Sequence, residues 1–240
     1  MEFEHIQTVS FDYGNTLIEL GACQTERLDD ALESGLTERY GRCDRGLLSS
    51  IRRSHRLAPY SNGFLENDLR HICRDLLRGL YDLEPGEGDV NWLIETRFEA
   101  FVELIVLPDG VRGVLARLSE RYRLALVSNY PCGRTIRSSL DKLGLVDAFE
   151  SIVVSGDIGY VKPHPEPFQA MLDEMAIEPP TCVFIGDNWL ADIQGAKRLG
   201  MSAIHFTGYE PHELAAPRPG DIEPDARIGH LRELEAILLD

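Results

Sequence analysis

Positive charge is scarce in this chain of 240 residues, and lysine is especially rare. Lysine occurs only at positions 142, 162 and 197, and 24 basic residues stand against 40 acidic ones, for a formal net charge of −16 at pH 7. Such an acidic chain is poorly suited to nucleic acid or to an anionic membrane surface, and we expect neither as a partner. An anionic small molecule remains compatible with it, because a local cation outweighs the distant field at short range.

Long apolar runs and metal-type cysteine spacings are missing as well. No apolar stretch approaches the roughly 20 residues of a membrane-spanning helix, and no basic segment followed by an apolar run marks a secretory leader. The five cysteines form no C-x-x-C pair and no cysteine–histidine spacing typical of zinc. We therefore expect a cytoplasmic protein with reduced thiols.

Short apolar segments alternate with helical patterns over most of the chain. This alternation predicts an α/β fold, a doubly wound, Rossmann-like parallel sheet with helices on both faces. Right-handed crossovers then bring the carboxyl ends of the strands to one edge, where such folds bind ligands. The predicted strands are Ile6–Phe11, Arg123–Val127, Ser151–Val154, Cys182–Ile185, Ala203–Phe206 and Ala226–Ile228. The predicted helices of this part are Gly133–Leu143, Pro165–Met175, Ala191–Leu199 and His230–Leu239.

The roughly 80 residues between the first two strands have helical periodicity and no strand signals. The helices predicted there are Thr25–Tyr40, Arg45–Arg56, Gly63–Leu80 and Val90–Val106. We predict that residues 1–20 and 105–240 form the α/β core domain and that residues 21–104 form a helical domain inserted over the ligand-binding edge. A surface loop rich in proline, glycine and acidic residues is expected over Gly208–Pro224.

Four segments place polar groups suited to phosphoryl transfer at the ends of apolar runs. Asp12 follows the first strand, where a carboxylate can attack phosphorus and form an acyl phosphate. Ser128 follows the second strand and can donate to a phosphoryl oxygen. Lys162 lies among apolar residues and prolines, where an ammonium would neutralise phosphoryl charge and keep a carboxylate ionised. Asp187 and Asp192 flank a strand-to-helix turn and can converge on one Mg²⁺, which prefers oxygen ligands.

Each of these groups has an ordinary structural explanation when it is taken alone. An aspartate at a strand end is usually a turn residue, Ser128 could cap the following helix, and Asp192 could be a favourable charge in a first helical turn. Their common order and their common place at strand ends make a chance arrangement improbable.

In this order and setting, the motifs resemble those of the haloacid dehalogenase superfamily. The matching segments are Asp12–Thr16, Ser128, Lys162 and Gly186-Asp187 with Asp192, and the resemblance extends over nearly the whole chain. It implies that the helical insertion is a cap that closes on the core and selects the substrate. It also implies a Mg²⁺-dependent phosphatase that forms an aspartyl-phosphate intermediate and acts on a small phosphorylated metabolite such as a sugar phosphate.

The resemblance also implies residue roles. The expected Mg²⁺ ligands are Asp12, the backbone carbonyl of Gly14, Asp187 and Asp192. The expected catalytic residues are Asp12 as nucleophile, with Ser128 and Lys162 on the transferring phosphoryl group. Asn129 and Thr16 are the expected substrate-side residues, Asn129 through its amide and Thr16 by orienting the Asp12 loop.

Gly14 departs from the family pattern. Phosphatases of the family usually have a second aspartate at this position, as general acid and then base, and losing such a group typically costs ~10²–10⁴ in rate. Asn15 follows where glycine is common, and asparagine tolerates positive φ, so the turn itself can survive. His55, within the helical insertion, is one candidate to replace the missing acid.

Three functions are compatible with this departure. The first is a phosphatase in which water or a cap residue supplies the proton. The second is a regulatory or binding module that holds a phosphoryl group without turnover. The third is a 2-haloacid dehalogenase, whose halide needs no proton, but which would leave Asp187 and Asp192 without a metal to bind. A receiver domain is disfavoured because it lacks so long a helical insertion.

Specificity is expected from cap residues that face the core and from the loop around Glu19–Gly21. Polar cap residues that could contact a substrate are Arg52, Arg53, Arg56 and Tyr60, although solvated helix faces explain them equally. The sequence indicates neither the substrate itself nor the oligomeric state.

Overall fold

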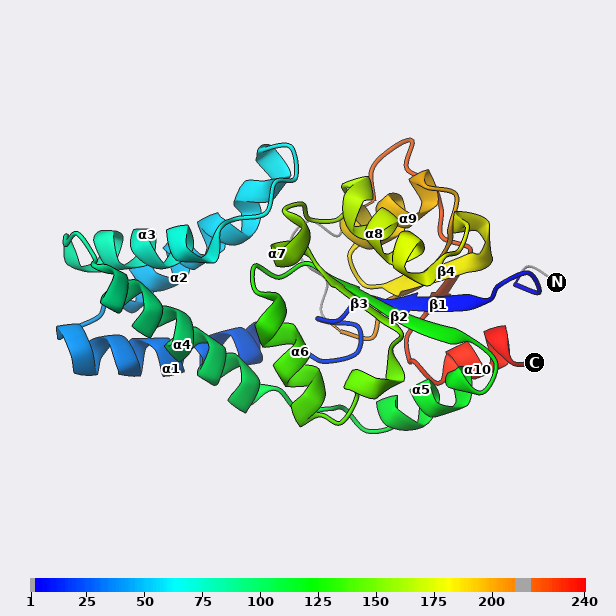
Figure 1. Ribbon diagram of the computed structural model, residues 1–240, viewed down its shortest axis with the longest axis horizontal. Helices are drawn as coiled ribbons and strands as arrows, with labels where there is room; N and C mark the ends of the chain where they lie inside the picture. Colours follow the sequence, from blue (N-terminus) through cyan, green and yellow to red (C-terminus); the bar gives the residue numbers. More distant parts are fainter. Residues whose placement is uncertain (1–2, 210–216) are drawn as a thin grey trace.

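The α/β architecture expected from the sequence is confirmed by a computed structural model, which describes residues 3–209 and 217–240 (Figure 1). Six parallel strands form one sheet in the order β3-β2-β1-β4-β5-β6. They are β1 (Thr8–Phe11), β2 (Arg123–Ser128), β3 (Ser151–Val154), β4 (Cys182–Gly186), β5 (Ser202–Phe206) and β6 (Ala226–Ile228). Each predicted strand is present, with its ends shifted by at most two residues.

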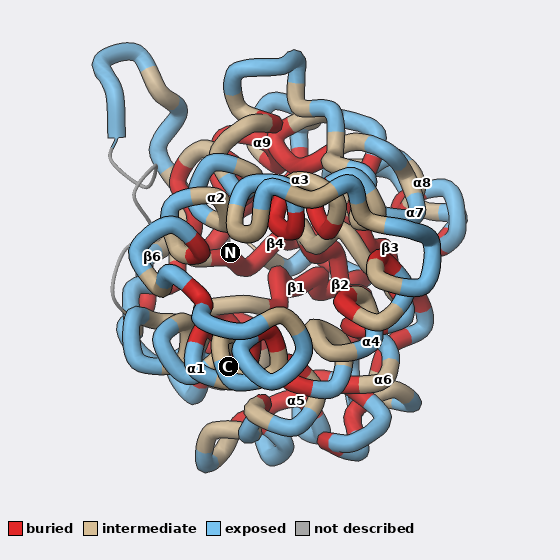
Figure 2. Tube along the Cα trace, turned by 90° about the vertical axis from the view of Figure 1, so that its left-hand side faces the viewer, coloured by how far each residue is buried: buried red, intermediate tan, exposed pale blue. Residues whose placement is uncertain are grey.

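Successive residues of the central strands pack into two different apolar clusters, one on each face of the sheet. Leu124 and Leu126 of β2 belong to one cluster, and Ala125 and Val127 belong to the other. The first face carries the helices α5 (Val111–Ser119), α6 (Gly133–Lys142) and α10 (Glu233–Leu238). The second face carries α8 (Pro165–Met175), the π-helix η4 (Trp189–Gln194) and α9 (Gly195–Arg198). Because both faces are covered, the central strands are buried along almost their whole length, and Figure 2 shows them buried at the centre.

The register of the three central strands aligns their carboxyl ends. Phe11 of β1 lies opposite Leu126 of β2 and Ile185 of β4. The residues that directly follow these positions therefore reach the same edge of the sheet.

A bundle of four helices lies beyond this edge, on the side of the molecule away from both termini (Figure 1). It consists of α1 (Ala22–Tyr40), α2 (Arg45–Leu57), α3 (Leu69–Tyr81) and α4 (Glu87–Leu104), with the 3-10 helix η1 (Ala58–Ser61) after α2. The bundle has an apolar cluster of its own, which includes Leu36, Leu48, Leu76 and Leu93. The division into domains at residues 20/21 and 104/105 stays a prediction.

Three of the predicted cap helices begin at the wrong residue, and one of them, α1, begins at Ala22, three residues before the predicted Thr25. Residues 63–68, predicted as the start of a helix, are a loop, because Gly63 and Phe64 both have a φ of 62° and Asp68 accepts hydrogen bonds from the first free amides of α3. Helix α4 begins three residues before the predicted Val90, since the Asp89 carboxylate caps the Gly86 amide at 3.1 Å.

Differences also occur in the core. Helix α5 is absent from the predicted elements, although Val111, Val114, Leu115 and Leu118 recur at helical spacing. The predicted helix Ala191–Leu199 begins two residues earlier, as the π-helix η4. The predicted helix His230–Leu239 is shorter, because the Glu233 carboxylate binds the amides of residues 229 and 230. The remaining short helices are α7 (Ser155–Ile158), η2 (Val146–Ala148) and η3 (Pro179–Thr181).

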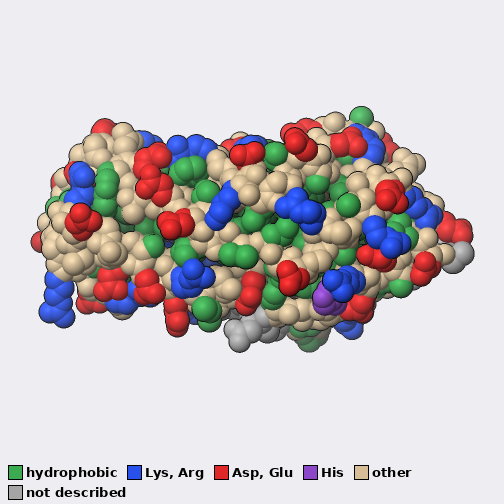
Figure 3. Space-filling view, turned by 90° about the horizontal axis from the view of Figure 1, so that it is seen from below, with side chains coloured by type: hydrophobic (Ala, Val, Ile, Leu, Met, Phe, Trp, Pro, Cys, Tyr) green, Lys and Arg blue, Asp and Glu red, His purple; other side chains and the backbone are tan. Residues whose placement is uncertain are grey.

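Of the predicted loop Gly208–Pro224, residues 210–216 lie outside the described part of the chain, and the other positions contain no helix or strand. Among the described residues, no helix has both the length and the apolar character needed to cross a membrane. On the face that Figure 3 shows, acidic and basic side chains are interspersed rather than separated.

Gly195, at the start of α9, allows this helix to approach the segment that carries Lys162. A Cβ atom there would lie 2.7 Å from the Phe168 ring and 3.2 Å from Pro163 Cα. Gly195→Ala should therefore destabilise the protein by about 1–3 kcal/mol, as overpacking does. Gly113→Ala is the matched control, because Gly113 lies in α5 with open space at its Cβ, and it should stabilise by about 0.5–1 kcal/mol. Urea unfolding of both variants measures the difference, and equal midpoints would contradict the packing argument.

Candidate active site

Polar side chains from widely separated segments meet at the carboxyl edge of the sheet. Asp12 follows β1, Ser128 ends β2, Asp187 follows β4 and Asp192 lies in η4. Lys162 enters from the loop between α7 and α8. Carboxylate oxygens of the three aspartates all lie within 4.8 Å of one another. The structure thus gathers residues that are more than a hundred positions apart.

Lys162 lies within this group and is 1% exposed. Its Nζ donates to Asp12 Oδ1 at 2.8 Å and to the Val127 carbonyl oxygen at 2.7 Å. The same nitrogen lies 2.8 Å from Asp192 Oδ1. Burial by itself lowers the pKa of Lys162, but the charges of Asp12 and Asp192 outweigh burial and raise the pKa above its ordinary value. The ammonium therefore stays charged although it is buried.

One ammonium does not neutralise three carboxylates. Burial raises the pKa of Asp12 to about 6, against the lowering effect of Lys162. Burial also raises the pKa of Asp187 to about 9, and the charges of Asp12 and Asp192 add to this effect. A group of buried carboxylates with uncompensated negative charge fits a hard divalent cation such as Mg²⁺. Gly14, whose carbonyl is the other predicted ligand, lies in the loop that begins at Asp12.

The loop after Asp12 has the conformation that its sequence favours. Thr16 Oγ1 donates to Asp12 Oδ2 at 3.2 Å, so both carboxylate oxygens of Asp12 have a donor. Asn15 adopts a φ of 56°, as expected for asparagine in this turn, and its Oδ1 accepts from the Leu20 amide at 2.7 Å. At Gly14, a Cβ atom would lie 2.8 Å from Leu20 Cδ1. Leu20 thus packs into the space that a side chain at position 14 would need.

Ser128 and Asn129 lie where the sequence places them, but the Asn129 amide has a structural partner. Ser128 is buried at the end of β2. Asn129 Nδ2 donates to the Lys162 carbonyl oxygen at 3.0 Å, and Asn129 Oδ1 accepts from the Lys162 amide at 2.8 Å. The Asn129 side chain therefore joins the two loops, whereas the sequence suggests only contact with substrate.

Asp192 is held by the turn that precedes it. Its Oδ2 accepts from the Asn188 amide at 2.9 Å, and the Asn188 side chain caps η4 through the amides of residues 190 and 191. A Cβ atom at Gly186 would lie 2.4 Å from Asp192 Oδ2, so only glycine leaves room for this carboxylate. On the outer side, His205 Nε2 is hydrogen-bonded with the Asp187 carbonyl oxygen at 3.0 Å. Asn188 is readable as a helix cap from sequence, but nothing in the sequence points to His205.

The loop after η1 attaches the cap to the core beside Lys162. The Val161 amide donates to the Phe64 carbonyl at 2.8 Å, and the Glu66 amide donates to the Gly159 carbonyl at 2.9 Å. The Glu66 carboxylate also accepts a hydrogen bond from Ser155 Oγ. Neither periodicity nor motif spacing predicts this pairing between the cap loop and the core.

Tyr60 and His55 are two cap residues that the sequence suggests for the site, and they lie in different places. The Tyr60 hydroxyl lies near the Asn129 side chain, and the charges of Asp12, Lys162 and Asp192 act on it, so Tyr60 lies at the carboxyl edge of the sheet. His55 instead faces α3, with Nε2 3.4 Å from Asp75 Oδ2 and its ring against that of His71. The described contacts of His55 therefore lie within the cap and give no support to it as the missing acid.

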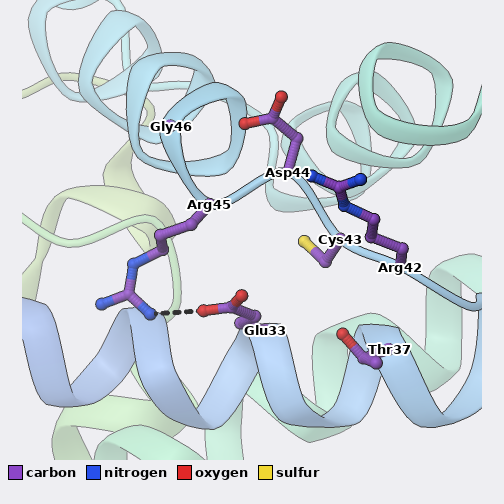
Figure 4. Close-up of a pocket in the computed structure, with 7 residues that line it drawn as sticks. All are labelled: Glu33, Thr37, Arg42, Cys43, Asp44, Arg45 and Gly46. Atoms are coloured by element: carbon purple, nitrogen blue, oxygen red, sulfur yellow. Dashed lines mark hydrogen bonds and ion pairs between the residues drawn. The ribbon is translucent and has the colours of Figure 1, made fainter.

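Figure 4 shows a pocket that does not belong to this site. Its lining residues all come from α1, the start of α2 and the turn between them. Arg45 Nη1 in this pocket is bound to Glu33 Oε2 at 2.9 Å and to Asp30 Oδ1 at 2.7 Å. The pocket faces the outside of the cap and contains none of the predicted catalytic residues.

Comparison with known proteins gives one consistent result. Residues 63–206 match the family described as haloacid dehalogenase-like hydrolase. The chain is 34% identical over 93 residues to haloacid dehalogenase-like hydrolase domain-containing protein 3 of Mus musculus, which covers 39% of this chain and 36% of that protein. It is 26% identical over 208 residues to glyceraldehyde 3-phosphate phosphatase of Pyrococcus furiosus, which covers 84% of this chain and 80% of that one.

The chain thus spans little more than a third of the length of the mouse relative. Among solved structures, it is similar to the HAD-hydrolase YfnB from Bacillus subtilis bound to magnesium, with a TM-score of 0.72 and 20% identity over 98% of this chain and 99% of that chain. At this identity, the likeness supports the fold alone.

The uncompensated charge at Asp187 leads to a test by metal binding. Asp187→Asn removes a carboxylate whose raised pKa shows that its charge is unfavourable in the metal-free protein, so the metal-free variant should unfold at the same temperature as the parent or higher. Mg²⁺ at about 100 times its Kd should stabilise the parent by about 2.7 kcal/mol, which is about 5–10 °C for a chain of this size.

Calorimetry with and without Mg²⁺ measures both effects, and Asp141→Asn, an exposed position in α6, is the control. The variant should lose the Mg²⁺-dependent shift and the control should keep it. A full shift in the Asp187 variant would remove this residue from the metal site.

Proposed function

This chain belongs to the haloacid dehalogenase-like hydrolase family, and we propose on that basis that it is a Mg²⁺-dependent phosphatase that works through an aspartyl-phosphate on Asp12. The observation that carries the proposal is the buried Lys162, whose Nζ joins Asp12 and Asp192 at 2.8 Å each. A buried lysine between two carboxylates at the edge of the sheet is costly to maintain unless the arrangement has a function.

The chain's own residues account for most of the reaction. One Asp12 oxygen attacks phosphorus while the bond from phosphorus to the leaving oxygen breaks. Lys162 and Ser128 hold the transferring phosphoryl oxygens, and Thr16 fixes the plane of the Asp12 carboxylate. Mg²⁺, held by Asp12, Asp187, Asp192 and the Gly14 carbonyl, would supply the remaining positive charge when bound.

Proton transfer is the step for which the chain offers no carboxylic acid. Because Gly14 has no side chain, the leaving oxygen takes its proton from water. A second water then attacks phosphorus of the aspartyl-phosphate, the bond to Asp12 breaks, and inorganic phosphate leaves with the proton that the water gives up. Both steps are slower than with a positioned acid–base group.

Two observations support a small substrate. The Pyrococcus furiosus relative is named for glyceraldehyde 3-phosphate, and the loop at residues 64–66 of the cap is hydrogen-bonded to the segment beside Lys162. A small phosphorylated metabolite fits both. Cytoplasmic location, the absence of nucleic-acid partners and the cap boundaries at residues 21–104 remain predictions of the same proposal.

A second function, phosphoryl binding without turnover, is favoured by one observation. Leu20 fills the space of a side chain at position 14, so the site has no place for the usual acid–base residue. In that function, acetyl phosphate or beryllofluoride would leave a lasting adduct on Asp12. A 2-haloacid dehalogenase would instead release chloride without metal and would not use the aspartate cluster.

Asp12→Asn tests the nucleophile directly. The amide is nearly the same size but does not form an acyl phosphate, so Mg²⁺-dependent release of phosphate should fall at least about 10⁴-fold. Excess chelator should abolish the activity of the parent. Phosphate release from p-nitrophenyl phosphate, with mass spectrometry of Asp12, measures both. Activity that survives the substitution would rule out the mechanism, and a persistent adduct without turnover would establish the binding function.

The missing acid predicts a dependence on the leaving group. Aryl phosphates, whose leaving oxygen needs no proton, should be hydrolysed at least about 10²-fold faster than alkyl phosphates. The double variant Gly14→Asp/Leu20→Ala restores a carboxyl group and the room for it, and it should narrow this ratio. Steady-state kinetics on a series of leaving groups gives the answer. Equal rates for aryl and alkyl esters in the parent would show that another residue donates the proton.

A further inference from the structure

The apolar interior of the cap ends in charged residues on the side that faces the core. Three cap helices each have a buried leucine in the apolar interior. About one helical turn nearer the core, each of these helices has an aspartate or an arginine. The pairs are Leu32 and Asp29 on α1, Leu48 and Arg52 on α2, and Leu93 and Arg97 on α4. These positions continue the inward-facing stripes, so their side chains point between the helices and toward the core.

Of the two arginines, Arg52 has an acidic partner. Arg52 forms an ion pair with Asp29, and the same carboxylate accepts from Ser49 Oγ at 2.5 Å. Arg97 has no such partner, because its Nε and Nη1 are buried without a hydrogen bond among residues 3–209 and 217–240. Burial lowers the pKa of Arg52 to about 10, and the charge of Arg97 lowers it further. The cluster therefore has an excess of positive charge.

This cluster lies over the loop that follows Ser128. Phe101 is one turn beyond Arg97 in α4, about 6 Å along the helix axis, and its ring lies 4.9 Å from that of Tyr130. Burial raises the pKa of the Tyr130 hydroxyl, and the charges of Arg97 and Arg52 act against this rise, so both guanidinium groups are close to Tyr130. Beside it, Asn129 lies near the hydroxyl of Tyr60 of the cap. The arginines thus face the substrate side of the cap.

An arginine used only for packing would have its donors satisfied. Arg78, on the outer face of α3, binds Glu84 at 2.7 Å, and Arg39 binds Asp89 at 3.0 Å. Leaving charged donors buried and unpaired is unfavourable, whereas the planar guanidinium is well suited to bind a carboxylate or a phosphate with two parallel hydrogen bonds.

We propose that Arg97, together with Arg52, forms a second anion-binding subsite that receives a carboxylate or a second phosphate of the substrate. The inference rests on the proposed phosphatase function, since the first phosphate of that substrate would be bound at Asp12. It narrows the substrate class to phosphomonoesters that carry a second oxyanion a few bonds from the ester phosphate.

The test compares matched substrates in matched variants of the full chain. One pair, 3-phosphoglycerate with glycerol 3-phosphate, differs by a carboxylate, and a second pair, fructose 1,6-bisphosphate with fructose 6-phosphate, differs by a phosphate. Arg97→Met should lower kcat/KM about 10- to 100-fold for the member with the additional oxyanion in at least one pair, mostly through KM, and less than threefold for the member without it. Arg78→Met, which removes an exposed arginine of the cap, should change neither. The pair that responds identifies the oxyanion.

Two further readouts separate the subsite from the phosphatase proposal and from a structural role. Arg97→Met should unfold at the same temperature as the parent or higher, because it removes unpaired donors, and a lower temperature with equal losses on both members would overturn the subsite. Calorimetric binding of the same pairs, with Mg²⁺, does not need turnover. Binding that favours the member with the additional oxyanion and depends on Arg97, without hydrolysis, would support the subsite and reject the phosphatase. Equal binding of both members by the parent would overturn the subsite.

Discussion

The buried ammonium of Lys162 between Asp12 and Asp192 is the interaction on which the rest of the site depends. Separating either carboxylate from it would leave an unpaired charge in a medium of low polarity, and removing one partner of a buried pair typically costs about 3–5 kcal/mol. The surrounding structure therefore serves to hold the pair. Asn129 fixes the backbone of Lys162, Gly186 leaves room for Asp192, and Thr16 holds the second oxygen of Asp12.

The excess of negative charge around this lysine explains how the same site can take both a cation and an anion. Three carboxylates and one ammonium repel further negative charge until a divalent ion is added. Burial raises the pKa values of Asp12 and Asp187, and the charges of the neighbouring carboxylates add to this rise. With the ion bound, a phosphoryl group would meet a site whose charges are nearly balanced. Binding of metal and of phosphate would then support each other, although the chain as a whole is strongly acidic.

The core and the cap supply different chemical groups to the site. The edge of the sheet supplies groups for one phosphoryl centre, whereas the cap places two arginines opposite it and joins the core by backbone hydrogen bonds at residues 64–66. These bonds lie only a few positions from Lys162, so movement of the cap and the position of the ammonium are linked through one short segment. Gly14 fits the same division, since Leu20, which leads into the cap, occupies the space that an acid–base side chain would fill.

The sequence by itself determined the sheet, the helical insertion and the residues at the strand ends, because burial on both faces enforces apolar strands and parallel strands bring their carboxyl ends to one edge. It also determined the turn after Asp12, where Asn15 adopts the positive φ that asparagine tolerates. The periodicity did not place the starts of α3 and α4, because hydrogen bonds from backbone amides to the Asp68 and Asp89 carboxylates set them. Only the tertiary structure decided that Asn129 binds the Lys162 backbone, that His55 faces Asp75, and that Arg97 Nε and Nη1 are buried without a hydrogen bond to any residue that the structure describes. Those facts depend on tertiary contacts between elements that are far apart in the chain, and local sequence spacing carries no information about such contacts.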